Sequence, residues 1–374
     1  MRYLIFLLLL VSSPAFALTV ITRHLTPGCA NNGDGTAASC AAGAGAAGAY
    51  NSFSNAISDI QSDYASFVAS DVQVTLRPYT GTAVDVQTSN VTINATMDST
   101  RYLLIQPQGA DRANGLYQGY RLECGGSNDS CITINGTNAD KVIIDGVAFK
   151  GTVPDGSGRG AVITITNNTY SEIINSFFWY AHASGSANTS VRNSAIDGDS
   201  VAGELYARNN IIYNFRQGIH VRSIFQTGSV FHINNNTVVD SRAYGIHMEM
   251  DGSTDTLGLY NNAIKGSTTT DYFLEYAATT YNNGTNATSD TSSPNNALDS
   301  STFTFVDAAN RDFHITSGDA GAKDRGTDCS TSCTGYVFSD DIDGSTRAGT
   351  WDVGADEQAS STPTFTVFQA IGAI

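Results

Sequence analysis

Hydrophobic and polar residues alternate in short runs that recur at a nearly constant spacing through the middle of the chain. Runs that start at Leu205, Phe231 and Leu257 stand 26 residues apart, and each ends in a pair of asparagines. The triplet Gly-Ile-His occurs at Gly218 and returns at Gly245. A period in the twenties is too short for paired helices and is typical of a solenoid built from short strands. The pattern therefore predicts an all-β chain folded as a parallel β-helix, with one coil per period.

The alternation also predicts which side chains face inward. Because successive side chains of a strand point to opposite sides, apolar positions of consecutive coils should stack inside the solenoid. The expected inner stacks are Leu205 with Phe231 and Leu257, and Ile219 with Ile246. Asparagine tolerates a left-handed backbone and can bond to its copy one coil away. We therefore expect the recurring asparagines to form a structural ladder at a bend: Asn209, Asn235 and Asn261.

The two ends of the chain depart from the repeat. Residues 1–17 combine a basic start, a short apolar run and a small-residue site, which predicts a signal peptide cleaved after Ala17 and a secreted or cell-surface protein. Residues at about 52–64 have helical periodicity and are expected to cap the first coil. The expected organisation is a capped β-helix over 18–296, a C-terminal coil and closing segment over 297–358, and a tail over 359–374. No segment after the signal peptide is apolar enough to span a membrane.

The six cysteines fall into three local pairs. Neighbouring residues meet in a solenoid coil, and export to an oxidising compartment favours disulfides. Zinc is the alternative, but no histidine lies at ligand spacing beside these cysteines. We therefore expect three disulfides: Cys29–Cys40, Cys124–Cys131 and Cys329–Cys333.

Charge restricts the choice of partner. The chain has a formal net charge of −16, which argues against nucleic acid and anionic membranes as partners. It provides no long-range attraction for an acidic polysaccharide either, so such a ligand would need a local basic patch. We expect a monomer.

Two C-terminal segments give a specific resemblance. The sequence FVDAANRDFHITSG, starting at Phe305, is followed by DIDGSTRAGTWDVGADE, ending at Glu357. Together they resemble the C-terminal signature of secreted bacterial right-handed parallel β-helix proteins of the pectin-lyase-like superfamily. The resemblance implies a right-handed β-helix with an N-terminal capping helix. That superfamily contains lyases, hydrolases, epimerases, adhesins and phage tailspikes, so the resemblance implies an architecture and not one reaction.

Outward-facing positions of three coils carry the candidate chemistry. If Ile219 and Ile246 face inward, the histidines beside them face outward. One coil earlier, Val191 and Arg192 occupy the equivalent positions, so Arg192 should also face outward. The expected outward patch is Arg192, His220, Arg222, His247 and Glu249. As a site, this patch would bind an extracellular polysaccharide or cell-surface glycan, as in an adhesin or matrix protein.

The same patch supports a catalytic alternative. A polysaccharide lyase cleaves a uronic-acid glycan by β-elimination, which needs a base and a positive group near the substrate carboxylate. His220 or His247 would be the base, and Arg192 or Arg222 the neutralising group. Hydrolysis would need paired carboxylates. Glu249 and Asp251 are the available pair, but they stand only two residues apart on one strand, which supports hydrolysis weakly. The structural alternative is a row of exposed ion pairs such as Arg222–Glu249.

Two further features bear on ligands. In the aromatic run from Phe177 to His182, core packing is the preferred interpretation; the alternative leaves some of Phe178, Tyr180 and His182 outside, where sugar rings stack on aromatic faces. Tyr180 is therefore a candidate ligand-binding residue. Asp340, Asp341 and Asp343 resemble part of a calcium loop, but a closing glutamate is missing, and we interpret them as a turn that pairs with Arg347. Calcium stays a possible cofactor, and no metal-binding residue is assigned.

Overall fold

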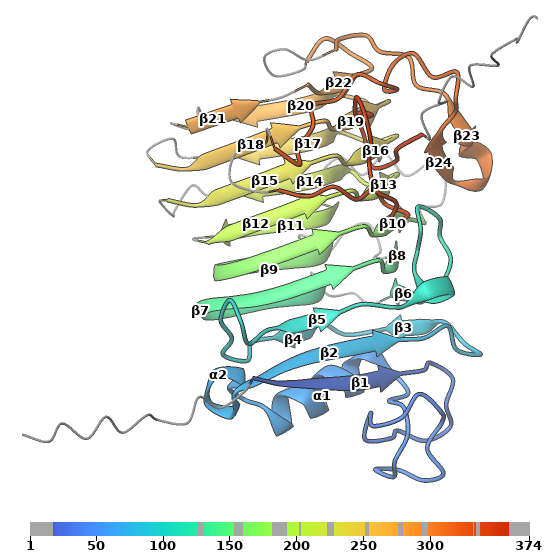
Figure 1. The fold of residues 1–374 in the computed structure, drawn as a ribbon, viewed down its shortest axis with the longest axis vertical. Helices are drawn as coiled ribbons and strands as arrows, with labels where there is room; N and C mark the ends of the chain where they lie inside the picture. The colour runs from blue at the N-terminus through green and yellow to red at the C-terminus, as the bar shows by residue number, and fades with distance from the viewer. Residues whose placement is uncertain are drawn as a thin grey trace, which may run out of the picture.

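The computed structural model confirms an all-β parallel β-helix. It describes residues 18–125, 130–152, 160–181, 193–201, 203–222, 228–250, 254–275, 280–283, 285–292, 298–331, 333 and 337–358. The expected signal peptide and the tail lie outside these residues. The strands form a fourteen-stranded sheet, an eight-stranded sheet and a two-stranded sheet. Figure 1 shows the coils stacked along one axis from the N-terminal to the C-terminal end.

Three faces of parallel strands surround the core. The first face contains β4 (Val91–Ile93), β7 (Ser130–Asp145), β9 (Gly160–Ile174), β11 (Asn193–Val201), β14 (Gln217–Arg222), β17 (Tyr244–Glu249) and β20 (Thr270–Glu275). The second contains β1 (Thr19–Leu25), β2 (Val72–Pro78), β5 (Leu103–Ile105), the ends of β7 and β9, β12 (Glu204–Arg208), β15 (Val230–Asn234), β18 (Thr256–Tyr260) and β21 (Thr280–Asn283). The third contains β3 (Asp85–Gln87), β6 (Arg121–Cys124), β8 (Ala148–Gly151), β10 (Phe177–Tyr180), β13 (Ile211–Tyr213), β16 (Thr237–Val239), β19 (Ala263–Lys265) and β22 (Ala287–Thr288).

The predicted inner stacks are confirmed. Leu205 pairs with Phe231 and Phe231 with Leu257 on adjacent coils, and all three side chains are buried. Ile219 and Ile246 likewise pair and are fully buried. Parallel strands repeat at about 4.8 Å, so each inner side chain contacts its equivalents above and below.

The asparagine-rich bend contains two rows. Asn209, Asn235 and Asn261 adopt a left-handed backbone, as predicted, and Asn261 donates to the Asn235 side chain at 3.2 Å. The more regular ladder lies one residue later, where each side-chain amide donates to the next asparagine at 3.0 Å: Asn210, Asn236, Asn262 and Asn286. These amides satisfy buried polar groups at the corner between the second and third faces, which supports the structural interpretation.

A helix lies at the N-terminal end of the solenoid. Helix α1 (Phe53–Asp63) buries Phe53, Ala56, Ile57 and Ile60, and the Ser52 side chain caps its N-terminus. Short elements α2 (Phe67–Ser70) and η1 (Gly109–Asp111) follow. Figure 1 places α1 beside β1, the outermost strand of the second face. The predicted helix at about 52–64 is therefore present in a capping position.

The three predicted disulfides are present. Cys29–Cys40, Cys124–Cys131 and Cys329–Cys333 have Cα separations of 5.3, 5.4 and 4.6 Å. Each closes a short loop, so each pins local structure. No helix among the described residues is long and apolar enough to cross a membrane.

The C-terminal segment packs against the third face and the asparagine corner. It contains β23 (Phe305–Asp307), η2 (Ala308–Asn310) and β24 (Asp312–Ile315), followed by irregular chain. Phe313, Ile342 and Ala355 pack in one buried cluster with Phe177 and Ile211 of the third face. This segment therefore covers part of the outer surface of the third face.

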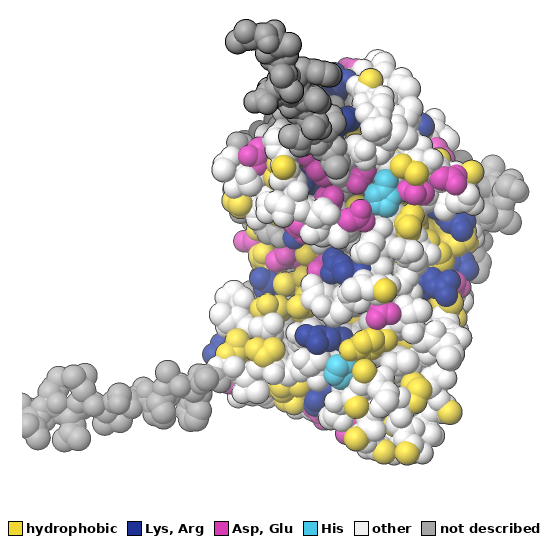
Figure 2. All heavy atoms as spheres, turned by 45° about the vertical axis from the view of Figure 1, so that its right-hand side comes forward, with side chains coloured by type: hydrophobic (Ala, Val, Ile, Leu, Met, Phe, Trp, Pro, Cys, Tyr) yellow, Lys and Arg dark blue, Asp and Glu magenta, His cyan; other side chains and the backbone are white. Residues whose placement is uncertain are grey.

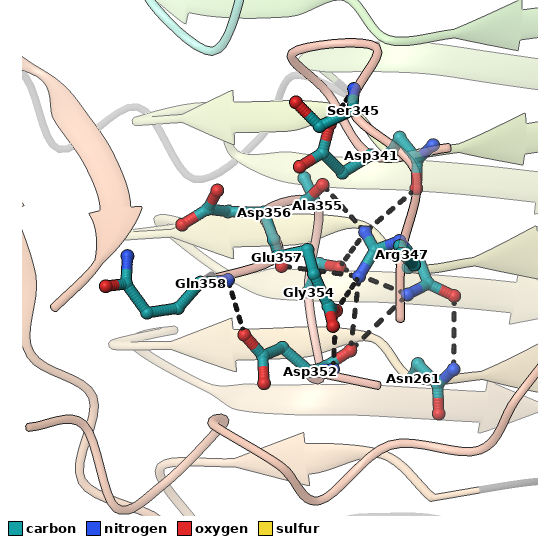
Figure 3. Close-up of polar contacts among 12 residues, drawn as sticks. Asn261, Asp341, Ser345, Arg347, Asp352, Gly354, Ala355, Asp356, Glu357 and Gln358 are labelled. Carbon is teal, nitrogen blue, oxygen red and sulfur yellow. Dashed lines mark hydrogen bonds and ion pairs between the residues drawn. The ribbon is translucent and has the colours of Figure 1, made fainter. Parts of the chain in front are cut away.

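A buried arginine holds this closing segment together (Figure 3). Arg347 donates to the carbonyl oxygens of Gly354 and Ala355 at 3.0 and 2.8 Å and to the Asn209 side chain at 3.2 Å. Its ion pair is with Glu357 at 3.1 Å. The predicted aspartate turn is present, but the carboxylate that pairs with Arg347 comes from Glu357, because the turn directs Asp341 toward its own backbone N–H groups.

Raising the pH is expected to destabilise the closing segment. Burial raises the pKa of Asp356 to about 6 from 3.8. Burial opposes protonation of His314, but hydrogen bonds to Asp343 and Asp312 and the charge of Asp356 raise its pKa to about 9 from 6.5. Both pKa values are raised by folding, so these contributions to stability are present at low pH and are lost as the pH rises through about 6 and then about 9.

Calorimetric melting temperatures measured across this pH range test the prediction. The melting temperature should fall steadily between about pH 4 and about pH 9. In His314→Gln the fall above pH 6.5, the unperturbed pKa of histidine, should be smaller than in the wild type, because the contribution of His314 is removed. A wild-type melting temperature that stays constant or rises would contradict it.

Candidate functional site

Two columns of outward-facing polar side chains cross β11, β14 and β17 on the first face. Asp197 pairs in register with His220, and His220 with His247. In the neighbouring column Asp199 pairs with Arg222, and Arg222 with Glu249. Together with an adjacent glutamine these form the first-face cluster: Asp197, Asp199, Gln217, His220, Arg222, His247 and Glu249.

His220 lies at the centre of the first-face cluster. Its Nδ1 is 2.7 Å from Asp197 Oδ1 and its Nε2 is 3.2 Å from Glu249 Oε1. Burial alone would lower the pKa of His220, but the hydrogen bonds to these two carboxylates dominate and raise it. Both ring nitrogens therefore lie where a protonated ring would donate to a carboxylate.

The remaining members are also held in place. His247 Nδ1 lies 2.7 Å from the Gln217 side-chain amide, and His247 Nε2 lies 3.6 Å from Glu249 Oε1. Arg222 forms an ion pair with Asp199, with Nε 2.9 Å from its carboxylate. Burying a charge costs free energy unless the charge is paired, so these mutual contacts offset the cost of burying the cluster.

The structure brings His220, Arg222, His247 and Glu249 together on the outer strand face, as predicted, but it does not leave them open. Their exposed fractions are 1, 8, 6 and 7%. Arg222 is paired with Asp199, so the expected exposed Arg222–Glu249 pair is not the arrangement found. A row of solvated surface ion pairs is therefore the wrong description of these residues.

The expected register one coil earlier is wrong. Ile196 and Asp197 pair with Ile219 and His220, whereas the sequence interpretation placed Val191-Arg192 there. The physical reason is a shorter coil, with 23 residues between Asp197 and His220. Arg192 lies outside the described residues, as do Asp251 and His182. The sequence interpretation thus missed Asp197 and Asp199, whose alternation with Ile196 was the available signal.

Aromatic and cationic side chains form a second candidate site on the third face. One outward column runs in register from Lys150 to Trp179 and Tyr213 and ends at Lys265, with buried Val239 between the last two. Residues from neighbouring segments flank this column. We call the set the third-face strip: Tyr117, Arg121, Lys150, Trp179, Tyr213, Lys265, Phe305 and Arg311.

Cations lie over the aromatic rings of the third-face strip. The Arg311 guanidinium is 4.0 Å from the Trp179 ring centroid, and the Lys150 ammonium is 5.4 Å from the same centroid. Arg121 and Lys265 lie over Tyr117 and Phe305 at 5.8 and 5.0 Å. Figure 2 shows Lys and Arg side chains beside hydrophobic ones on the side of the molecule that Figure 1 shows to carry the third face.

Three of these cations lack a close ion pair within the described part of the chain, although the charge of Lys265 acts on Asp240. Among the described residues, Arg121, Arg311 and Lys265 form no ion pair, whereas Lys150 pairs with Glu123 at 2.9 Å. The aromatic rings of Tyr117, Trp179, Tyr213 and Phe305 are only partly buried. The strip is therefore a local basic and aromatic surface on an acidic protein.

Tyr180 does not belong to this surface. Its side chain is 3% exposed and packs against Phe215, with Arg242 over its ring. Phe178 is fully buried as well. The preferred interpretation of core packing is therefore confirmed for these two residues, and the ligand-facing alternative for Tyr180 is wrong. In β10 the residue that faces outward is Trp179, one position earlier, on the opposite face of the strand.

Comparison with known proteins adds an architectural similarity only. No protein-family model matches the sequence, and no curated protein matches it. Among solved structures, the chain is similar to the crystal structure of pectate lyase Pel9A, with 12% sequence identity and a TM-score of 0.33 over 91% of this chain and 97% of that one. At this identity and TM-score, the similarity carries no argument about the function of either candidate site.

Proposed function

We propose that this protein binds an acidic extracellular polysaccharide through the third-face strip. The observation that carries the proposal is a group of cations that form no ion pair among the described residues and lie beside partly exposed aromatic rings: Arg121, Lys265 and Arg311 with Tyr117, Trp179 and Phe305. The chain has a net charge of −16, so basic side chains gathered without ion pairs on one face favour an anionic ligand. Export, expected from residues 1–17, fits an extracellular ligand.

The form of the strip fits a linear polymer. Its central column follows the solenoid axis, and successive strands stand about 4.8 Å apart. This repeat is close to the length that one sugar unit adds to an extended polysaccharide. Aromatic faces would contact the sugar rings, and guanidinium and ammonium groups would contact carboxylate or sulfate groups. The role would be that of an adhesin or matrix protein.

The lyase alternative has weaker support from geometry. The base for β-elimination must reach the substrate, but the two candidate bases, His220 and His247, are buried, and both nitrogens of His220 are hydrogen-bonded to carboxylates. Among the described residues, the first-face cluster also contains three carboxylates beside Arg222, and these carboxylates would repel a uronate. Binding without cleavage is therefore the preferred function.

Replacing Trp179 by alanine is expected to weaken binding of acidic polysaccharide about tenfold, or about 1.4 kcal/mol, because it removes an aromatic face for a sugar ring and the cation–π contacts that position Arg311 and Lys150. Arg311→Gln should weaken it by a similar factor. Binding would be measured by calorimetry with polygalacturonate, alginate and hyaluronate, with a neutral glucan for comparison. Wild-type affinity for the acidic polymers should fall with added salt, since it depends on screened charge.

Phe273→Ala is the matched control, because Phe273 is a partly buried aromatic residue of the first face. It should leave binding unchanged. Binding lost in Phe273→Ala or Arg222→Ala but retained in Trp179→Ala would move the site to the first face. Accumulation of unsaturated, ultraviolet-absorbing product would support the lyase alternative, and no binding to any acidic polymer would refute the proposal.

A further inference from the structure

We propose that His220, His247 and Glu249 form a binding site for a divalent transition-metal ion, with zinc as the expected ion. The three residues lie on the adjacent strands β14 and β17, and one ligand atom from each lies within 4.8 Å of the others. All three side chains are buried. This inference is independent of the third-face strip and of polysaccharide binding.

The distances between the ligand atoms fit tetrahedral coordination. Ligands about 2.0–2.1 Å from a tetrahedral zinc ion lie about 3.3–3.4 Å from one another. His220 Nε2 is 3.2 Å from Glu249 Oε1, and His247 Nε2 is 3.6 Å from the same oxygen. Both distances are close to this value, so a metal ion bound by the three atoms would take the place of the contact between His220 and Glu249.

The neighbours of both histidines are those that metal-binding histidines usually have. A ligating histidine commonly donates its second ring N–H to a carboxylate or an amide oxygen, which fixes the tautomer. Asp197 accepts from Nδ1 of His220 at 2.7 Å. The Gln217 amide lies 2.7 Å from Nδ1 of His247, and a half-turn of this amide would present its oxygen there. Both Nε2 atoms are thereby directed toward Glu249.

The ligand set selects the kind of metal. Two imidazoles and one carboxylate suit zinc and neighbouring transition metals, whereas calcium prefers six to eight oxygen ligands. The ion expected at this site therefore differs from calcium, the ion considered for the aspartate turn. Because Gln217, His220, His247 and Glu249 come from consecutive coils, the bound ion would also fasten β14 to β17.

Metal titration of the mature chain without a histidine tag tests the site. After treatment with a chelator, the wild-type protein should bind one zinc ion per chain in calorimetry and should compete with a zinc-sensitive dye. Cobalt should give the visible spectrum of a tetrahedral nitrogen–oxygen site. Zinc should also raise the melting temperature, because it binds the folded chain preferentially. Absence of saturable binding would overturn the proposal.

Variants identify the ligands. His220→Ala would leave two buried carboxylates without their histidine and could unfold the protein, so His247→Gln is the primary variant. It should abolish the cobalt spectrum and the zinc-induced rise in melting temperature. Asp197→Asn should lower zinc affinity about 10- to 100-fold, because the amide oxygen can still accept from His220 Nδ1 but no longer carries the negative charge that raises the basicity of the ring. His314→Gln removes the histidine of the closing segment and should bind zinc normally. Binding retained in His247→Gln, or lost in His314→Gln, would refute the site.

Discussion

Replacing Phe231 by alanine is expected to lower the free energy of unfolding by about 3–5 kcal/mol. Phe231 is fully buried and lies between Leu205 and Leu257 in one inner stack. Truncation removes most of its side chain, and the coils above and below cannot move into the space because main-chain hydrogen bonds fix their spacing. The cost therefore includes the lost burial and the cavity that remains.

Phe231→Leu is the matched control for this prediction. The equivalent positions of both adjacent coils are leucines, so the stack should accept a leucine with a loss below about 1.5 kcal/mol. Denaturant unfolding followed by circular dichroism would give both values. A loss below about 1 kcal/mol in Phe231→Ala would mean that the stack is not closely packed, and it would contradict the arrangement described above.

The sequence was sufficient to predict the repetitive part of the fold. Two coils of nearly equal length place Ile219 beside Ile246 and Leu205 beside Phe231, because alternation decides which side chains face inward. Local spacing was likewise enough for the disulfides, since each pair closes a loop within one region of the chain. These features depend on interactions within a coil or between equivalent positions of adjacent coils.

The first-face cluster could be predicted only in part. His220, Arg222, His247 and Glu249 belong to the two regular coils, so their shared face followed from the repeat. Asp197 belongs to a coil of different length, and a constant period therefore selected Arg192 in its place. Burial of the cluster was not predictable either, because alternation separates inward from outward positions but does not show what covers an outward position.

The third-face strip was missed for two physical reasons. The bend before β10 shifts the alternation, so Trp179 faces outward and Tyr180 inward. In addition, Arg311 and Phe305 come from the closing segment, more than a hundred residues after Trp179, and no local pattern places them beside it. Contacts between distant segments therefore determine which residues form this surface, whereas the repeat predicts only the strands beneath it.

Replacing Arg347 by methionine is expected to release the closing segment from the asparagine corner. The guanidinium is fully buried, and it donates to carbonyl oxygens of Gly354 and Ala355 and to Asn209 while pairing with Glu357 (Figure 3). Methionine fills a similar volume but donates no hydrogen bond. The buried acceptors and the Glu357 carboxylate would lose their partner, at a cost of about 3–5 kcal/mol.

This loss should be local, because the inner stacks do not depend on Arg347. Hydrogen exchange should accelerate in residues 337–358 and at Asn209 and Asn235, whose side chains contact the closing segment, while β14 and β17 stay protected. Arg347→Lys should give an intermediate effect, since lysine keeps the charge but lacks the planar set of donors. Arg325→Met, at an exposed position of the same C-terminal region, should be neutral. Unchanged exchange in Arg347→Met would show that apolar packing of Phe313, Ile342 and Ala355 is sufficient to hold the segment without the arginine.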